Sequence, residues 1–134
     1  MTSMVTGGVR ILLRIEGLCV FVVSLLAYAK FGNGWGTFAL FFFVPDLSFF
    51  GYLAGPDVGA VSYNFAHSFI GALVILAVGA FMSAPVVITA GIIWSAHIGF
   101  DRTLGYGLKY SSGFGFTHLG IIGRARTDAS SSMR

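Results

Sequence analysis

Four apolar stretches dominate this chain of 134 residues, and they run over residues 9–28, 35–54, 60–81 and 84–104. Each is close to the roughly 20 residues that a helix needs to cross the hydrocarbon of a bilayer. Strands of a membrane barrel alternate polar and apolar residues over about ten positions, and these stretches do not. Because backbone groups in lipid must satisfy one another, helices remain as the solution. We therefore expect an all-α, polytopic membrane protein, a bundle of four transmembrane helices in a lipid bilayer.

Short joints rich in glycine, proline and serine separate the stretches, so neighbouring helices should be antiparallel. Lys30 alone is basic on the side away from the termini. Seven basic residues lie on the side of the termini: Arg10, Arg14, Arg102, Lys109, Arg124, Arg126 and Arg134. Basic residues mark the cytoplasmic side. The sequence thus predicts a multi-pass protein of the cell membrane with both termini cytoplasmic, and it assigns Arg102 an anchoring role.

Composition supports one membrane domain. The chain is 56% hydrophobic and only 10% charged, against roughly 25% charged residues in soluble domains. Its net charge of +3 comes from basic residues at the chain ends beside apolar runs, which does not indicate a nucleic-acid partner. We expect a single integral membrane domain over residues 1–126 and a disordered, serine-rich tail over residues 127–134. A homo-oligomer is compatible with so thin a bundle.

Residues 1–29 also admit a different interpretation. Arg10 and Arg14 precede a short apolar core, and Ala27-Tyr28-Ala29 is similar to the cleavage site of a secretory signal peptide. Cleavage there would leave three helices and move the new terminus outside. Glu16 interrupts the start of the core, which favours a retained first helix.

Ionisable residues inside the apolar stretches carry the functional information, because each costs a few kcal/mol in the membrane unless it is paired, ligated or wet. Threading the helices alternately up and down at about 1.5 Å per residue places five of them at one depth, roughly 5 to 12 Å below the cytoplasmic boundary. They are Glu16, Asp46, His67, His97 and Asp101. His97 and Asp101 are four residues apart and so share one face of a helix.

Two imidazoles and several carboxylates at one depth predict a divalent-metal site. Nitrogen and oxygen ligands suit zinc, iron or manganese, and a single cysteine, Cys19, excludes a thiolate cluster. The expected ligands are Asp46, His67, His97, Asp101 and His118, the last from a glycine-rich hairpin that would fold back over the cytoplasmic mouth. Glu16 or Asp101 would act as catalytic base toward a metal-activated water. Pro45 predicts a kink or break beside Asp46.

Two alternatives to a metal site stay open. The histidines and aspartates could hydrogen-bond only one another and specify helix packing in a non-catalytic membrane partner. They could instead relay protons or ions in a small transporter or channel subunit. The outer halves of the last two stretches, residues 69–81 and 85–93, are almost wholly apolar, which favours a pocket open on one side.

Several motifs resemble an uncharacterised family of bacterial membrane proteins, domain of unknown function 4260. They are Pro45-Asp46-Leu47-Ser48, Tyr63-Asn64 with His67, His97 to Arg102 and Thr117-His118-Leu119-Gly120. The resemblance extends from Glu16 to about Gly123 and implies a bacterial inner-membrane location. The family's name implies no activity.

A looser resemblance is to the LexA-regulated membrane-bound metal-dependent hydrolases, on the elements Pro45-Asp46, His67-Ser68 and His97 to Asp101 in that order. It differs at Ser48, where those proteins carry a second aspartate. The resemblance implies that Asp46, His67, His97 and Asp101 are metal ligands. It also implies a hydrolase of a membrane-borne substrate, for example an ester or phosphate on a lipid.

Overall fold

The computed structural model describes residues 5–109 and 116–121 of the chain. The prediction of a disordered tail over residues 127–134 falls outside this part. Most of the described residues are helical: α1 (Gly7–Phe31), α2 (Trp35–Phe42), the 3₁₀-helix η1 (Val44–Ala54), α3 (Pro56–His67), α4 (Phe69–Phe81) and α5 (Pro85–Leu104). A short antiparallel hairpin, β1 (Phe116–Thr117) and β2 (Gly120–Ile121), is the departure from the all-α expectation.

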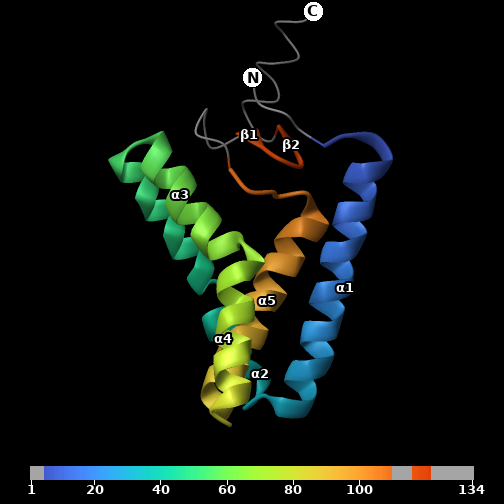
Figure 1. The fold of residues 1–134 in the computed structure, drawn as a ribbon, viewed down its shortest axis with the longest axis vertical. Coiled ribbons are helices and arrows are strands. Elements are labelled where there is room, and N and C mark those ends of the chain that lie inside the picture. The colour runs from blue at the N-terminus through green and yellow to red at the C-terminus, as the bar shows by residue number, and fades with distance from the viewer. Residues whose placement is uncertain (1–4, 110–115, 122–134) are drawn as a thin grey trace, which may run out of the picture.

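The helices form four units that alternate in direction (Figure 1): α1, α2 with η1, α3 with α4, and α5. Three of these units are long and apolar enough to cross a membrane by length and composition, namely Gly7–Phe31, Trp35–Ala54 and Pro56–Phe81. The start of α1 and the end of α5 lie at the same end of the molecule. The fold is therefore that of a helical membrane protein.

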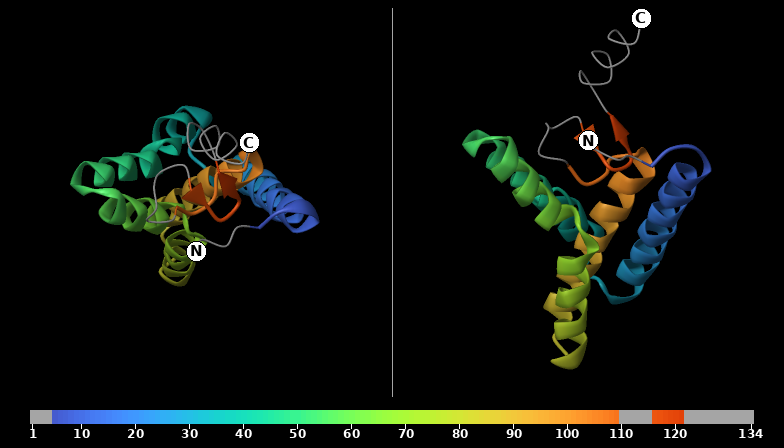
Figure 2. Two further views of the ribbon diagram at one scale, coloured as in Figure 1. Left: turned by 90° about the horizontal axis from the view of Figure 1, so that it is seen from above. Right: turned by 45° about the horizontal axis from the view of Figure 1, so that its top comes forward.

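Two of the expected spans are interrupted. The second changes from an α-helix to a 3₁₀-helix after Phe42, so the break predicted at Pro45 is present. The third, expected as one helix over residues 60–81, begins earlier at Pro56 and is divided in two by Ser68, whose backbone is extended. Proline fits the first turn of a helix, where its missing N–H has no helical partner, which accounts for the early start. In Figure 2, α3 leans away from α5, whereas α4 runs beside it.

The antiparallel pair α1 and α5 pack closely because two glycines face each other. A Cβ atom placed on Gly99 would stand 2.8 Å from the carbonyl oxygen of Gly17 and 2.7 Å from the backbone nitrogen of Phe21. Arg14 Nε also donates to the carbonyl of Thr103 at 2.9 Å. The absence of side chains at this crossing sets the distance between the two helices and thus holds α5 in place.

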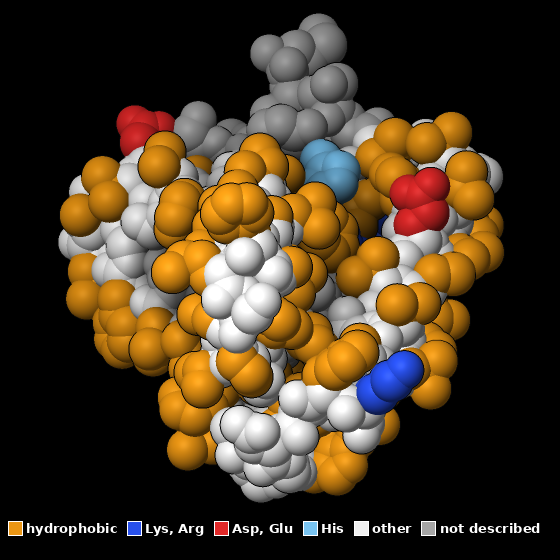
Figure 3. Space-filling view, turned by 60° about the horizontal axis from the view of Figure 1, so that its bottom comes forward, with side chains coloured by type: hydrophobic (Ala, Val, Ile, Leu, Met, Phe, Trp, Pro, Cys, Tyr) orange, Lys and Arg blue, Asp and Glu red, His pale blue; other side chains and the backbone are white. Residues whose placement is uncertain are grey.

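Apolar side chains cover most of the outer surface of the described residues. The small internal core contains Tyr28, Phe42, Ile92, Ile93 and Ala96. In contrast, Leu53 is 86% and Phe81 93% exposed, and the face in Figure 3 is largely hydrophobic. A surface of this kind is stable in lipid and not in water.

The hairpin lies over the end of α5 (Figures 1 and 2). Its turn residue His118 donates its backbone N–H to the carbonyl of Leu108 at 3.1 Å, and Lys109 pairs with Thr117 in an isolated antiparallel bridge. Leu119 and Thr117 are fully buried. The hairpin expected from the glycine-rich sequence is therefore present, packed on the segment that follows α5.

Candidate metal centre

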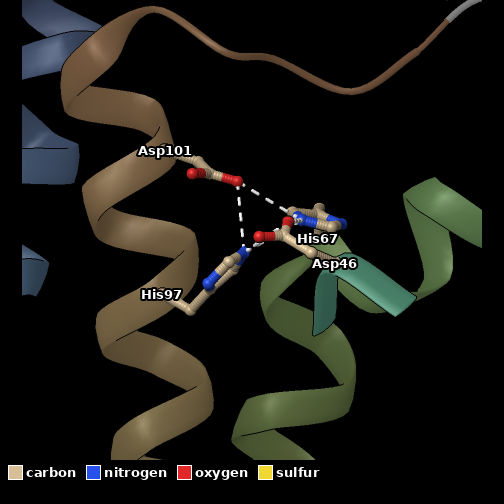
Figure 4. Close-up of side chains that lie close together, drawn as sticks. All are labelled: Asp46, His67, His97 and Asp101. Atoms are coloured by element: carbon tan, nitrogen blue, oxygen red, sulfur yellow. Dashed lines mark hydrogen bonds and ion pairs between the residues drawn. The ribbon is translucent and has the colours of Figure 1, made fainter. Parts of the chain in front are cut away.

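Three helical units bring four side chains together (Figure 4). Asp46 lies in the first turn of η1, immediately after Pro45. His67 is the last residue of α3, next to the break at Ser68. His97 and Asp101 are one turn apart on the same face of α5. Both helix breaks thus lie directly beside a residue of the cluster.

The facing atoms of these side chains lie at nearly equal distances. His67 Nε2 stands 3.1 Å from His97 Nε2, 3.3 Å from Asp46 Oδ1 and 3.3 Å from Asp101 Oδ2. His97 Nε2 stands 3.2 Å from Asp46 Oδ1 and 3.3 Å from Asp101 Oδ2. Each residue offers one ligand atom, and all four atoms lie within 4.8 Å of one another.

These separations match a tetrahedral metal site. Ligand atoms at about 2.0 Å from a tetrahedral zinc ion are separated from each other by about 3.3 Å. Five of the six separations in the cluster are between 3.1 and 3.3 Å. A single ion among these atoms would have both imidazole nitrogens and both carboxylate oxygens near it.

The protonation of His67 is fixed by its backbone partner. Its Nδ1 lies 2.9 Å from the carbonyl oxygen of Tyr63, and a carbonyl can only accept, so Nδ1 carries the proton. In the neutral ring, Nε2 then presents a lone pair to two carboxylate oxygens and a second imidazole. Second-sphere bonds of this kind orient the histidine ligands of metals. A cation at the centre would face this lone pair and the two carboxylate oxygens.

Side chains of α5 satisfy the carbonyls freed by the helix break. Trp94 Nε1 donates to the carbonyl of Ala66 at 2.5 Å, and Arg102 Nη2 donates to the carbonyl of His67 at 3.0 Å. The last carbonyls of a helix lack helical partners and attract cations. Arg102 is only 9% exposed. The guanidinium therefore has a structural role inside the protein, and the anchoring role expected from its basic charge stays a prediction.

The segment after α5 closes the site on the side of the hairpin. Tyr63 stacks on the ring of His67 with centroids 3.8 Å apart, and Lys109 Nζ stands 4.8 Å above the Tyr63 ring. Asn64 binds the backbone of Lys109 twice, donating to its carbonyl at 2.8 Å and accepting from its N–H at 2.6 Å. Burial lowers the pKa of Lys109 to about 8, and the charge of Asp101 opposes that shift.

Access to the cluster is uneven. The side chains of His67 and His97 are 2% exposed, that of Asp101 is 14% exposed, and that of Asp46 is 33% exposed. The imidazoles are therefore enclosed, with Phe42 packed edge-on against His97 at 5.1 Å between centroids. Asp46 is thus the most exposed of the four side chains.

Two residues expected at the site lie outside the cluster. Glu16 is exposed on α1, because its neighbour Gly17 occupies the face that contacts α5 and successive helical residues point about 100° apart. His118 accepts a hydrogen bond from the N–H of Leu108 through Nδ1 at 2.8 Å. Burial, and secondarily the charge of Arg102, lowers the pKa of His118.

Sequence reasoning did not identify the supporting roles of Trp94, Arg102 and Lys109. Their partners are backbone carbonyls or an aromatic ring distant in the sequence, so no local sequence pattern indicates these roles. Asn64 carried a weak signal, since it belongs to the Tyr63-Asn64 motif next to His67.

Comparison with known proteins yields one match. No curated protein and no solved structure matches the chain, so the looser resemblance to the metal-dependent hydrolases gains no support from them. Residues 10–122 match the model of a family described as "Domain of unknown function (DUF4260)". That range includes all four residues of the cluster and the hairpin above them. The chain belongs to this family of uncharacterised function.

Proposed function

We propose that the protein is a membrane metalloprotein whose Asp46, His67, His97 and Asp101 bind one divalent ion. The observation that carries the proposal is the convergence of four atoms that can each act as a metal ligand, five of whose six separations are 3.1 to 3.3 Å. Nitrogen and oxygen ligands with this spacing favour zinc over iron or manganese, which more often take six ligands.

In the proposed topology all four helical units cross the membrane, α5 included, and both termini are cytoplasmic. The predominance of basic residues near the termini supports this orientation. The metal then lies in the cytoplasmic half of the bundle, roughly 5 to 12 Å below the boundary. A metal at this depth suits chemistry on a substrate held in the membrane.

The proposed reaction is hydrolysis of a membrane-borne ester or phosphate. A tetrahedral ion with four protein ligands has no open position, so the ion would either take a fifth ligand or release Asp46, the most exposed of the four. In that state it would polarise the bond to be cleaved and lower the pKa of a bound water toward about 7. Asp46 and Asp101 each face the centre through one oxygen, so the second oxygen of either carboxylate remains to accept a proton. The partial exposure of Asp46 supplies the route for substrate and water.

Metal content of the detergent-purified protein tests the proposal. Inductively coupled plasma mass spectrometry should find close to one zinc, iron or manganese per chain in the wild type. The content should fall at least tenfold in His67→Ala and His97→Ala, because each removes a ligand. His118→Ala is the matched histidine control and should keep the metal. Asp46→Asn should lower the affinity, with the exposed Asp57→Asn as its control.

Each contrary result identifies an alternative. If the wild type stays metal-free after reloading and its cluster variants fail to fold, the four side chains form a hydrogen-bonded network that serves helix packing without a metal. Loss of metal in His118→Ala as well would show that the hairpin histidine enters the coordination sphere.

A further inference from the structure

An apolar groove of about 520 Å³ lies between the second unit, α3 and α5. Its walls include Val44, Pro45, Phe65, Ala66, Ile93 and Trp94. Pro45 and Ala66 directly precede the cluster residues Asp46 and His67 in the chain. One end of the groove thus lies beside the metal centre.

The groove offers little for a polar occupant to bind. Ser48 Oγ donates to the carbonyl of Pro45 at 2.7 Å, and Thr89 Oγ1 donates to that of Pro85 at 2.8 Å. The indole N–H of Trp94 is engaged by the carbonyl of Ala66. These three polar groups of the wall are hydrogen-bonded within the protein. Two further polar residues, Asn33 and Thr37, line the groove in the joint before α2 and in its first turn. A hydrocarbon chain is the complementary occupant, since it demands no hydrogen bonds.

The groove and the metal centre occupy the same face of α5. Val86, Ala90 and Ile93 line the groove, and His97 and Asp101 continue at the same helical spacing of three or four residues. At about 1.5 Å per residue, Val86 lies about 16 Å from His97 along the helix. A chain that lies in the groove therefore points directly at the cluster.

Positive charge lies beyond the cluster in the same direction. Lys109 follows the end of α5 and stands over the Tyr63 ring that stacks on His67. Arg102 reaches the carbonyl of His67 from the same end of α5. Along α5 the apolar groove comes first, then the metal ligands and then the cations. An anionic membrane lipid is complementary to this order, with its hydrocarbon tail at the groove and its charged head group at the metal and the cations.

Resting on the proposed function, we propose that the substrate is a lipid phosphate ester. Its hydrocarbon chain lies in this groove, and its phosphate reaches the metal. The groove then decides which lipid chains the enzyme accepts, and the metal centre acts on the head group.

Binding of hexadecyl phosphate and butyl phosphate to the detergent-purified full chain tests this inference, with native mass spectrometry as the readout. We expect one hexadecyl phosphate per chain and at least tenfold weaker binding of butyl phosphate. Ala90→Trp fills the groove from an exposed position and should weaken binding of hexadecyl phosphate at least tenfold. Ala77→Trp places the same side chain at an exposed position of α4 outside the groove and should not change binding.

Equal binding by the two tryptophan variants, or equal binding of the two phosphates, would overturn the inference. The proposed function fails separately. In that case the wild type would hold no metal, and His97→Ala would bind hexadecyl phosphate as the wild type does. Weaker binding by Ala90→Trp than by Ala77→Trp would still show that the hydrocarbon chain lies in the groove.

Discussion

Asn64 connects the cluster-bearing helix α3 to the segment that closes the site. Its side chain makes two hydrogen bonds to the backbone of Lys109. Asn64→Ala removes both and leaves a buried N–H and carbonyl without those partners, at a cost of about 1–3 kcal/mol. We expect faster amide hydrogen exchange over residues 105–109, measured by mass spectrometry. Asn33→Ala, in the joint after α1, serves as control, and unchanged protection in Asn64→Ala would refute this role.

At the scale of single residues, the sequence located the cluster because buried ionisable groups are costly in lipid and few in number. Depth along alternating helices identified Asp46, His67, His97 and Asp101. Depth does not specify direction around a helix, which is why Glu16 shares the layer and yet lies outside the cluster. The role of Arg102 was not predictable, because its partner is a carbonyl freed by a break 35 positions away in the chain.

At the scale of elements, the crossing of α1 and α5 depends on Gly17 and Gly99. Gly99→Ala would place a methyl group 2.7 Å from the backbone nitrogen of Phe21. The helices must then separate, at a cost of about 1–3 kcal/mol. Thermal unfolding in detergent should show a lower midpoint for Gly99→Ala. Gly36→Ala is the control, since nothing lies within 4 Å of its added Cβ, and an equal effect of the two would contradict the account.

The presence of the helices could be predicted from the length of the apolar stretches alone, whereas only one of their two breaks could be predicted. Pro45 announced the first break, because proline cannot donate the helical hydrogen bond. Nothing in the sequence around Ser68 predicts the second break. That break is stabilised from outside, by Trp94 and Arg102 on the freed carbonyls and by Ser68 Oγ, which accepts from the N–H of Ile70.

At the scale of the whole molecule, the proposed four-span topology predicts which joints face outward. In a Cys19→Ser background, Ser83→Cys between α4 and α5 should react with a membrane-impermeant maleimide in intact cells. Asp57→Cys, at the opposite end of the molecule, should react only after permeabilisation. Labelling of Asp57→Cys in intact cells would reverse the proposed orientation, and labelling of both would exclude four spans.

The central claim is that two imidazoles and two carboxylates hold one metal ion. X-ray absorption at the edge of the metal found in the purified protein tests it most directly. We expect about four nitrogen or oxygen neighbours at about 2.0 Å, with the outer-shell scattering of two imidazole rings. A sulfur neighbour near 2.3 Å, an absence of imidazole scattering, or a protein that holds no metal even after reloading would contradict the account.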